Sequence, residues 1–232
     1  SDHGRIFVTV DGEDPDMVYN VPASTVTVFP GEEHGLHSPK EEFTVALNSY
    51  FHQQNEGGNE LVFLNLQAAR LGVLDLERFK RQIHYCTLPN GTCTDLALQT
   101  KGRYDDTSAF DFMARMGIWF ENFALPVVIN ECLIQSYTGI IRLFPNWPED
   151  MDASFQTLRA VGAFLVSCER RNRQIQSLTI ESEKGGTCRL YNPYEKESVI
   201  VNTGNEAVKV SQQDDVISFE TEPGLLYELS EG

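Results

Sequence analysis

The stretch GIWFENFALPVVINECLIQSYTGIIRLFPNWP, residues 117–148, decides the fold of this chain. Pro126 near a first turn and Gly139 as a stop predict a helix over residues 123–137. From Ile140 onward, short apolar segments alternate with turn residues, which indicates strands. The chain therefore changes from helical to β structure, and we expect a domain boundary between residues 141 and 142.

Residues 31–141 form the predicted helical domain. Ser38-Pro39-Lys40-Glu41 supplies an N-cap, a proline at N1 and a Glu at N3, so a helix is expected from Ser38 to about Gln54. Further helices are expected over 59–71, after the cap residue Asp75, and over 108–117. Residues 1–30 read as an extended N-terminal segment, with short strands or extended segments at 5–10 and 24–29.

Residues 142–232 contain the predicted β domain. Partly alternating segments with turn residues between them are typical of an antiparallel β-sandwich. The expected fold class is therefore α+β, in two units. The segments are IIRLF, AFLVSCE, QIQSLTIES, TCRLYNP, SVIVN, VKVS, VISFE and LLYELS.

Charge excludes several classes of partner. The chain has 34 Asp and Glu against 18 Lys and Arg, a formal net charge of -16, which repels nucleic acid and anionic membrane surfaces. The sequence contains no run of about 18 apolar residues, so no membrane span is predicted. The N-terminal SDHGRIFVTV has no basic region followed by an apolar signal core.

The five cysteines give no support for a metal site, because they form no CxxC pair. Cys86 and Cys93 bracket a turn, and Cys168 and Cys188 lie on neighbouring predicted strands, so each pair is a candidate disulfide. Buried, unpaired thiols are the default interpretation. Walker, dinucleotide, GxSxG and zinc-protease motifs are absent, and we expect no cofactor.

Glu121 is the candidate catalytic residue. It lies among Trp119, Phe120 and Phe123, and apolar company can raise the pKa of a carboxyl and suit it to proton transfer at neutral pH. Flat aromatic faces such as Trp119 also suit sugar rings. The simpler interpretation, favoured on the residues alone, is a helix-start Glu that complements the helix dipole among core aromatics.

Further candidate substrate-binding residues lie in predicted loops. Glu56 and Asn59 flank two glycines that would let backbone approach a ligand, although a solvated turn for Glu56 and a helix cap for Asn59 are the favoured interpretations. Arg103 and Tyr104 lie in a long polar loop, a mixture typical of sugar recognition and of solvated loops alike. Trp147 suits sugar stacking, but packing at the junction of the units is the simpler use.

The order of helices, the segment ECLIQSYTGIIRLFPNWP at 131–148 and the predicted sandwich together resemble the C-terminal part of bacterial α-L-fucosidase-like enzymes of glycoside hydrolase family 95. ARLG at 69–72 matches the closing helix of a preceding hairpin in that family. The resemblance implies an (α/α)6 catalytic toroid of six helical hairpins followed by a small β-sandwich. It also implies a periplasmic or extracellular location and a plant or host glycan as substrate.

The family places a catalytic Asp in an Ile-Asp-Gly-Asn-Phe type segment just before this helix. An ungapped alignment puts Asn122 and Phe123 on the Asn and Phe, Glu121 on the Gly and Phe120 on the Asp. The expected base is therefore missing at its own position, and Glu121 stands one residue later. Either the longer Glu side chain replaces it, with Asn122 as its polar neighbour, or the base is lost.

The other half of the family's chemistry is expected outside this chain. An inverting glycosidase needs two carboxyl groups about 6.5–9.5 Å apart, and the family's acid comes from earlier hairpins. The resemblance therefore implies a C-terminal portion that needs the N-terminal remainder of the polypeptide and is inactive alone. The alternatives are a non-catalytic glycan-binding or scaffold protein descended from such an enzyme, and a complete small interaction protein.

Overall fold

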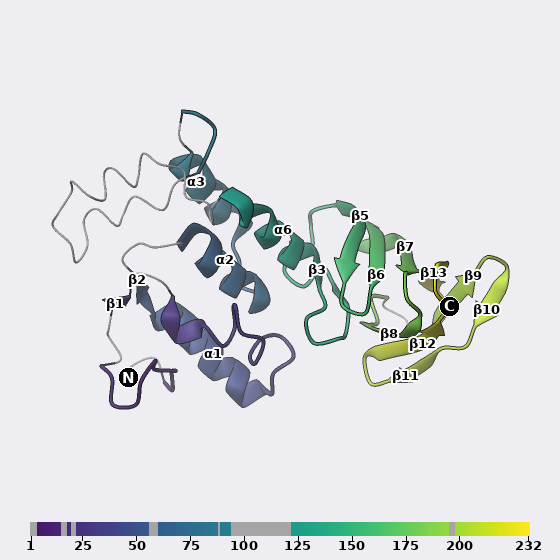
Figure 1. The fold of residues 1–232 in the computed structure, drawn as a ribbon, viewed down its shortest axis with the longest axis horizontal. Helices are drawn as coiled ribbons and strands as arrows, with labels where there is room; N and C mark the ends of the chain where they lie inside the picture. Colours follow the sequence, from purple (N-terminus) through teal and green to yellow (C-terminus); the bar gives the residue numbers. More distant parts are fainter. Residues whose placement is uncertain are drawn as a thin grey trace. The chain divides into compact units, whose positions relative to one another are not determined.

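The computed structural model describes residues 4–14, 18–19, 22–55, 60–87, 89–93, 122–194 and 198–232. The chain divides into two units, Ser1–Glu131 and Cys132–Gly232. The division falls inside helix α6 (Leu125–Leu133), ahead of the expected boundary at 141/142. Figure 1 shows the helices gathered in the first unit and most of the strands in the second. The helix expected over 108–117 and the loop that precedes it lie outside the described residues.

In the residues that the structure describes, unit 1 is built mainly from helices. Asp75 caps α3 by accepting a hydrogen bond from the Arg78 amide at 3.0 Å, as the sequence predicts. Gly72, with φ of +71°, ends the preceding helix. The described helices are the short 3₁₀ helix η1 (Ala23–Thr25), α1 (Lys40–His52), α2 (Glu60–Arg70), α3 (Leu76–Cys86) and α6.

Helix α1 begins later than predicted. Its N-cap position is Pro39, and the Ser38 hydroxyl instead accepts a hydrogen bond from the Gly35 amide at 3.0 Å. The predicted capping box is therefore wrong, because Ser38 is used in the turn before the helix. Phe43, Leu47 and Tyr50 pack against the core as expected, whereas Phe51 is 66% exposed.

Neither of the segments 5–10 and 24–29, for which the sequence favours short strands or extended segments, forms a strand. Residues 5–10 lie along α1, where the Phe7 amide donates to Ser49 Oγ at 2.7 Å and Asn48 Nδ2 donates to the Arg5 carbonyl at 3.3 Å. Residues 24–29 turn through η1 and i to i+3 hydrogen bonds. The described strands of unit 1 are short, with β1 (Val18–Tyr19) parallel to β2 (Gln54–Asn55). β-Branched residues in these segments are therefore not a sign of sheet pairing: Thr25 and Val28 are buried, whereas Val8, Val10 and Val26 are exposed.

The core of unit 1 is centred on α2, which is buried on most sides as predicted. The larger cluster of buried side chains contains Leu61, Val62, Leu66, Phe79, Cys86, Cys93 and Val128. A second cluster joins Val28, Ala46 and Leu71, with Phe7 and Phe43 packed against it. Among the described residues, no helix is long and apolar enough to cross a membrane.

Unit 2 is an antiparallel β-sandwich, which confirms the predicted class. Its six-stranded sheet has the order β10-β9-β13-β7-β6-β5, and a three-stranded sheet has the order β11-β12-β8. The strands are β3 (Ile134–Gln135), β4 (Arg142–Leu143), β5 (Ala153–Ala160), β6 (Phe164–Arg171), β7 (Gln174–Ser182), β8 (Gly186–Tyr191), β9 (Val199–Thr203), β10 (Glu206–Val208), β11 (Ser211–Gln213), β12 (Val216–Thr221) and β13 (Leu225–Glu231).

The two short strands β3 and β4 extend the smaller sheet. They pair with each other, and Ile141, just before β4, forms a parallel bridge with Leu190 of β8. The Ile141 amide donates to the Arg189 carbonyl and its carbonyl accepts from the Tyr191 amide, both at 2.9 Å. The segment IIRLF therefore belongs to the sandwich, although only Arg142–Leu143 of it is a strand.

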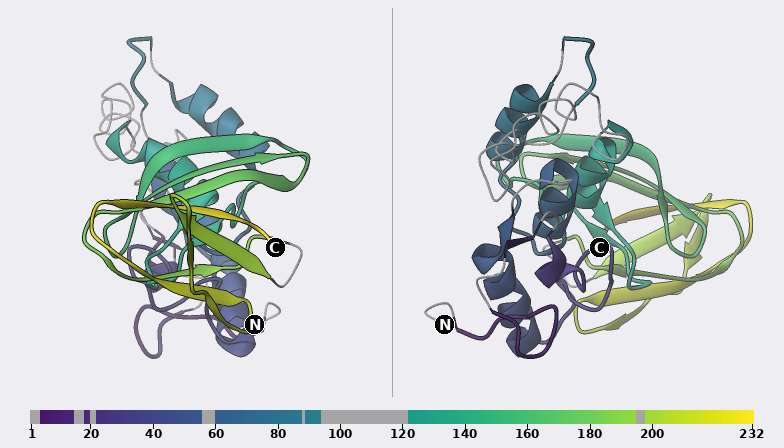
Figure 2. Two further views of the ribbon diagram at one scale, coloured as in Figure 1. Left: turned by 90° about the vertical axis from the view of Figure 1, so that its right-hand side faces the viewer. Right: turned by 60° about the vertical axis from the view of Figure 1, so that its left-hand side comes forward.

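The core of the sandwich lies between the two sheets, whose layers are visible in Figure 2. Phe219 of β12 meets Tyr227 of β13 with ring centroids 5.4 Å apart. The hydroxyls of Ser182 and Thr221, both buried, lie 2.8 Å apart and join β7 to β12. Side chains from both layers fill the space, among them Val166, Cys168, Leu178, Ile180, Cys188, Leu190 and Ile217.

Strand β5 is absent from the sequence prediction. Its sequence ASFQTLRA alternates poorly, because the β5–β6 register shifts between Phe155 and Leu158 and Thr157 has φ of +54°. A bulge adds a residue to one strand and so interrupts the period of two that sequence analysis detects. The predicted segment VKVS divides in the structure between β10 and β11.

None of the five cysteines forms a disulfide, and all five are buried. Neither candidate disulfide forms, and the default interpretation of buried thiols is confirmed. Cys168 and Cys188 lie in different sheets of the sandwich, and burial raises the pKa of each thiol to about 12. Thiols with such pKa values remain protonated and behave as small apolar side chains.

Candidate functional site

Of the described residues, Asn122 is the nearest in sequence to the candidate base Glu121, and its side chain forms hydrogen bonds with the backbone. Its Oδ1 accepts from the Cys93 amide at 2.8 Å, and its Nδ2 donates to the Cys93 carbonyl at 2.7 Å. Asn122 precedes α6, whereas Cys93 ends the turn after α3. This two-bond contact fixes the chain at the start of α6 against the end of that turn, so the position beside Glu121 is anchored.

Substituting Asn122 tests this anchor. Asn122→Ala removes both hydrogen bonds, and at about 0.5–1.5 kcal/mol each we expect the free energy of unfolding to fall by about 1–3 kcal/mol in urea denaturation. Asn122→Asp keeps an acceptor for the Cys93 amide and should lose about half as much. N122A should also expose one additional reactive thiol, absent from N122A/C93S. Unchanged unfolding and thiol reactivity in N122A would contradict the anchor.

A buried ion pair lies further along α6 in unit 1. Arg70 Nη2 of α2 donates to Glu131 Oε1 at 3.4 Å, with the two side chains 7% and 15% exposed. Arg70 Nη1 donates to the carbonyls of Val28 and Gly31 at 3.0 and 2.8 Å, and its guanidinium lies 4.9 Å from the Phe29 ring centroid. Arg70 therefore joins α2, the 28–31 turn and α6.

The Glu131 carboxyl has a raised pKa. Burial disfavours its charged form, and the Glu32 carboxylate adds to this, while Arg70 opposes both effects by its charge and hydrogen bond. A raised pKa in a buried carboxyl is a feature of catalytic acids, but ion pairs within the structure produce it too. Because Glu131 is engaged with Arg70 inside the helical packing, we assign it a structural role.

Gln67 extends the polar network beside Arg70. Its Nε2 donates to the carbonyls of Pro22 and Phe29, each at 3.1 Å, and its Oε1 accepts from Thr25 Oγ1 at 2.5 Å. Sequence analysis missed Gln67, Arg70 and Glu131. The signal was available, since polar side chains inside an otherwise apolar helix need buried hydrogen-bond partners.

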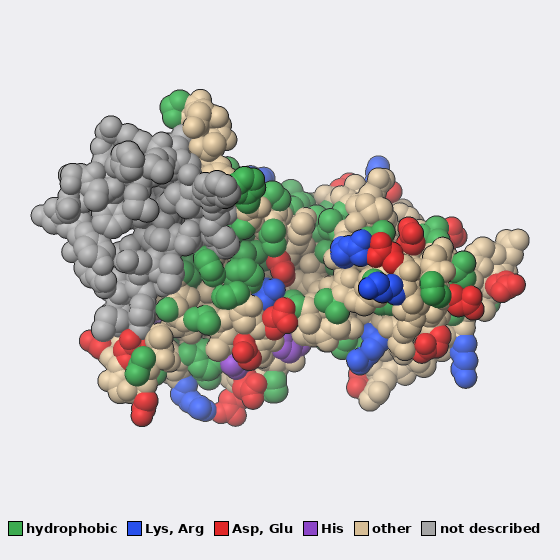
Figure 3. All heavy atoms as spheres, in the orientation of Figure 1, with side chains coloured by type: hydrophobic (Ala, Val, Ile, Leu, Met, Phe, Trp, Pro, Cys, Tyr) green, Lys and Arg blue, Asp and Glu red, His purple; other side chains and the backbone are tan. Residues whose placement is uncertain are grey.

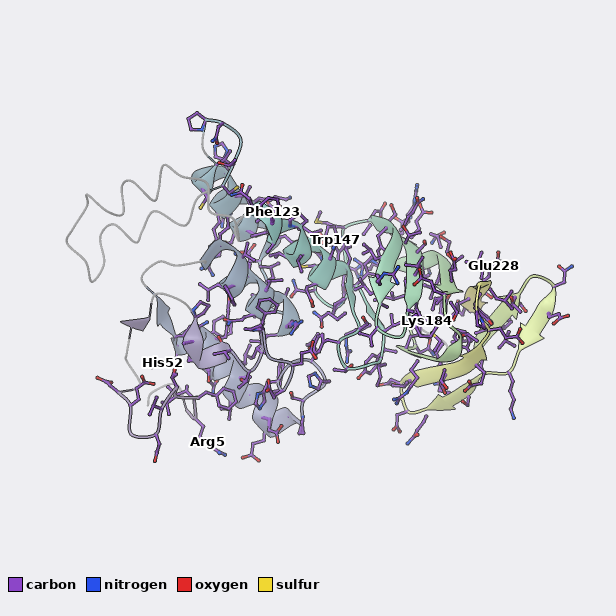
Figure 4. All side chains as sticks on the ribbon, in the orientation of Figure 1. Arg5, His52, Phe123, Trp147, Lys184 and Glu228 are labelled. Atoms are coloured by element: carbon purple, nitrogen blue, oxygen red, sulfur yellow. The ribbon has the colours of Figure 1, made fainter. Side chains whose placement is uncertain are left out.

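Trp147 lies in the loop between β4 and β5 of unit 2 and is half-buried (Figure 4). Its amide donates to the Phe144 carbonyl at 3.4 Å, and its indole Nε1 is buried with no hydrogen-bond partner among the described residues. The backbone amide of Asn146 donates to the Cys132 carbonyl at 3.4 Å, which links this loop to Cys132. These contacts pack Trp147 within unit 2.

Arg170 of β6 forms hydrogen bonds with the same loop. Its Nη2 donates to the carbonyls of Pro148 and Met151 at 2.6 and 3.2 Å, and the guanidinium lies 4.6 Å from the Phe144 ring centroid. Burial lowers the pKa of Arg170, while the charges of Glu149 and Asp152 oppose this effect. Arg170 therefore helps to hold residues 144–151 in place, together with the contact of Asn146 with Cys132.

Arg170→Met should release this loop. Two charged hydrogen bonds to carbonyls are lost, so we expect unfolding of unit 2 to require about 2–3 kcal/mol less. Trp147 fluorescence, read in a Trp119→Phe background because the chain has two tryptophans, should shift toward that of solvated indole. Arg171→Met is the matched control, since Arg171 is an exposed neighbour paired with Glu169. Equal effects of the two variants would contradict this assignment.

The remaining predicted site residues lie outside the described residues. Only Asn122 and Trp147 of the predicted set can be placed, and they belong to different units. The roles predicted for the others stay predictions. The residues concerned are Glu56, Asn59, Arg103, Tyr104, Trp119 and Glu121.

Comparison with known proteins gives one family match. Residues 135–229 match the family model described as Glycoside hydrolase family 95, C-terminal domain. No match to a curated protein is found. The matched range begins in β3 and ends in β13, so it spans the strands of unit 2.

The fold and this match define unit 2 as a β-sandwich domain of the kind carried by glycoside hydrolases. The match supports, more particularly, a C-terminal part of a family 95 glycoside hydrolase. A glycan is accordingly the class of substrate indicated for the enzyme to which such a domain belongs.

Proposed function

We propose that this chain is the C-terminal portion of an inverting, α-L-fucosidase-like glycoside hydrolase. The observation that carries the proposal is the match of residues 135–229 to the family 95 C-terminal domain, directly after a helical unit. In this proposal α1, α2, α3 and α6 belong to the last hairpins of an (α/α)6 toroid. The substrate is an α-L-fucoside or related α-L-galactoside in a plant or host glycan, and the enzyme is bacterial and periplasmic or extracellular.

The proposed reaction is direct attack of water on the anomeric carbon. Glu121 takes the proton from that water, and a second carboxyl group, from hairpins outside these 232 residues, protonates the leaving oxygen. The Asn122–Cys93 contact supports this role because it anchors the residue beside Glu121. A base must be held in place to act, since a displacement of about 1 Å can cost 10²-fold in rate.

Exposed apolar side chains in unit 1 fit a helical unit that normally packs against further hairpins. Phe51 on α1 is 66% exposed, and Phe123 at the start of α6 is 75% exposed (Figure 4). Figure 3 shows hydrophobic side chains gathered on one face of unit 1. Large exposed apolar patches commonly mark surfaces that another part of a protein covers. The isolated chain should therefore be inactive and prone to associate.

The test compares this chain with the longer polypeptide on aryl α-L-fucosides and α-L-galactosides. We expect hydrolysis by the longer polypeptide only, and proton NMR of the first product formed should show the inverted anomer. Direct attack of water gives inversion, whereas a covalent intermediate gives retention. Retention, or hydrolysis by the 232-residue chain alone, would overturn the proposal.

A non-catalytic glycan-binding protein is the second candidate. The observation that favours it is Phe120, which occupies the position where the resemblance expects the catalytic Asp. The side-chain amide of Asn122 also engages the Cys93 backbone through both its oxygen and its nitrogen. This candidate predicts that the longer polypeptide binds glycans without hydrolysing any glycoside of the panel.

A further inference from the structure

The six-stranded sheet of unit 2 separates locally between β7 and β13. Pairing of these strands ends at Leu229 with Leu178. Beyond that point, the first residues of β7 pair with β6, and Ser230 and Glu231 of β13 pair with β9. Two strands that are neighbours over most of their length thus part at one end of the sheet.

A recess of about 170 Å³ occupies this separation. It lies wholly in unit 2 and is open to solvent. Polar and charged residues make up most of its lining, and the apolar Ile175, Pro193 and Leu229 make up the remainder. The polar members are Arg173, Gln174, Gln176, Tyr194, Ser230 and Glu231.

Tyr194 is the fixed aromatic wall of the recess. Its hydroxyl donates to the Leu229 carbonyl at 2.8 Å, at the last residue where β13 pairs with β7. Burial raises the pKa of Tyr194, so the phenol stays neutral at physiological pH. With its hydroxyl engaged, the ring offers an apolar surface in one orientation.

The glutamines and arginine supply donors along one side of the strand. Gln174 and Gln176 are two residues apart on β7, so their side chains emerge on the same face. Gln176 Nε2 donates to the Gln174 carbonyl at 3.4 Å, which holds its amide near the strand. Arg173, with φ of +68°, belongs to the two-residue turn that joins β6 to β7.

The chemistry of this wall selects the ligand class. A phosphate or other anion is disfavoured because Glu231 lines the recess together with Arg173, in a chain of formal charge -16. A purely apolar ligand would leave the amide and guanidinium groups without partners. Hydroxyl groups both donate and accept, as the amides of Gln174 and Gln176 do, and so match the wall.

We propose that this recess binds one neutral sugar residue of a glycan through Gln174, Gln176 and the ring of Tyr194. The inference rests on the proposed function for its choice of a glycan, and it adds a non-catalytic contact on the β-sandwich. Such a contact holds the enzyme on a polymeric substrate and raises the local concentration of chain near the catalytic groups.

The test is a proton–nitrogen NMR titration of the 232-residue chain with methyl α-L-fucoside, methyl α-L-galactoside and methyl α-D-glucoside. We expect saturable shifts of the Gln174 and Gln176 side-chain amides for at least one glycoside, with a Kd of about 1–10 mM, as suits a ligand of this size. Gln176→Ala and Tyr194→Ala should each weaken binding at least about tenfold, the loss expected for one good contact.

Gln212→Ala is the matched control, because Gln212 is an exposed glutamine on β11 of the other sheet. It should bind as the wild type does. Gln176 is exposed and far from the core, so Q176A keeps the test valid if Y194A unfolds. Absence of shifts up to about 100 mM, ten times the weakest expected Kd, overturns the proposal. Equal binding by Q176A and Q212A overturns it as well.

Hydrolysis by the longer polypeptide is measured separately, so the two proposals fail independently. Glycoside hydrolysis without sugar-induced shifts in unit 2 would overturn the sugar-binding proposal for the recess and leave the proposed hydrolase function standing. If sugar-induced shifts occur and Q176A abolishes them, while the longer polypeptide hydrolyses no glycoside, the sugar-binding proposal stands and the proposed hydrolase function is overturned.

Discussion

Glu121→Gln in the longer polypeptide is expected to lower kcat on the cleaved glycoside by about 10²–10⁴-fold, the usual contribution of a general base. The amide of Gln accepts no proton from water but has nearly the same shape, so substrate binding should change little. The effect should therefore appear in kcat and not in KM. Steady-state assays of the purified variant give both constants.

Two further variants locate the base more exactly. Glu77→Gln on α3 makes the same chemical change at an exposed position and should leave kcat unaltered. Phe120→Asp with Glu121→Gly restores the Asp-Gly order that the resemblance expects. If wild type is inactive and this double variant hydrolyses glycosides, the usual base has been lost from the chain. If wild type is active and E121Q matches its rate, Glu121 is not the base.

Arg70→Met should lower the free energy of unfolding of unit 1 by about 3–5 kcal/mol, the range for removing one partner of a buried ion pair. The change leaves the Glu131 carboxylate buried without its cation and removes hydrogen bonds to the Val28 and Gly31 carbonyls. Urea denaturation followed by the helical circular dichroism signal measures the loss. Lys80→Met, which breaks an exposed pair with Glu77, should cost less than about 1 kcal/mol.

The pH dependence separates the charge effect of Arg70 from its packing. Arg70 lowers the pKa of Glu131, so R70M raises that pKa further above its unfolded value. When the pKa of a carboxyl is higher in the folded than in the unfolded protein, the folded state is more stable below the unfolded pKa and is destabilised as pH rises. The difference between wild type and R70M should therefore be smaller at about pH 4 than at about pH 8. A pH-independent difference would assign the loss to packing.

The double variant R70M/E131Q removes both charges and completes the comparison. Because the uncompensated buried carboxylate is gone, we expect it to be more stable than R70M alone at about pH 8. The coupling between the two sites follows from the four-way cycle with E131Q. If R70M/E131Q is no more stable than R70M, the pair does not contribute as an ion pair.

Local signals in the sequence predicted the regular helices of unit 1 closely. Asp75 before an amphipathic run gave the start of α3, and Gly72 gave the end of the preceding helix. These features depend on residues within one turn of each other, so sequence alone carries them. Ser38 shows the limit, since two neighbouring turns compete for the same hydroxyl and tertiary packing decides between them.

The sandwich was predicted from strands that alternate, and strand β5 was missed because it does not. Its register shift against β6 is visible only once the partner strand is known. The segments at 5–10 and 24–29 form no strands for a related reason. Phe7 and Val28 pack in a cluster with Ala46 and Leu71, whereas Val8, Val10 and Val26 are exposed, and a short apolar run does not say which partner will cover it.

The candidate site, too, was predicted only in part from the sequence. The sequence placed Glu121 beside Asn122 and suggested a polar pair, but the contact of Asn122 with Cys93 joins residues 29 positions apart and follows only from folding. The recess between β7 and β13 likewise has no local signature, because it arises where two strands stop pairing.

The sequence by itself determined the α+β class, the change from helices to strands and the resemblance to a glycoside hydrolase, because periodicity, caps and motifs are properties of neighbouring residues. Only the tertiary structure decided where buried charges such as Arg70 and Glu131 meet and which strands leave a recess. Burial and pairing between distant segments set those features, since the free energy of a polar group depends on what surrounds it after folding.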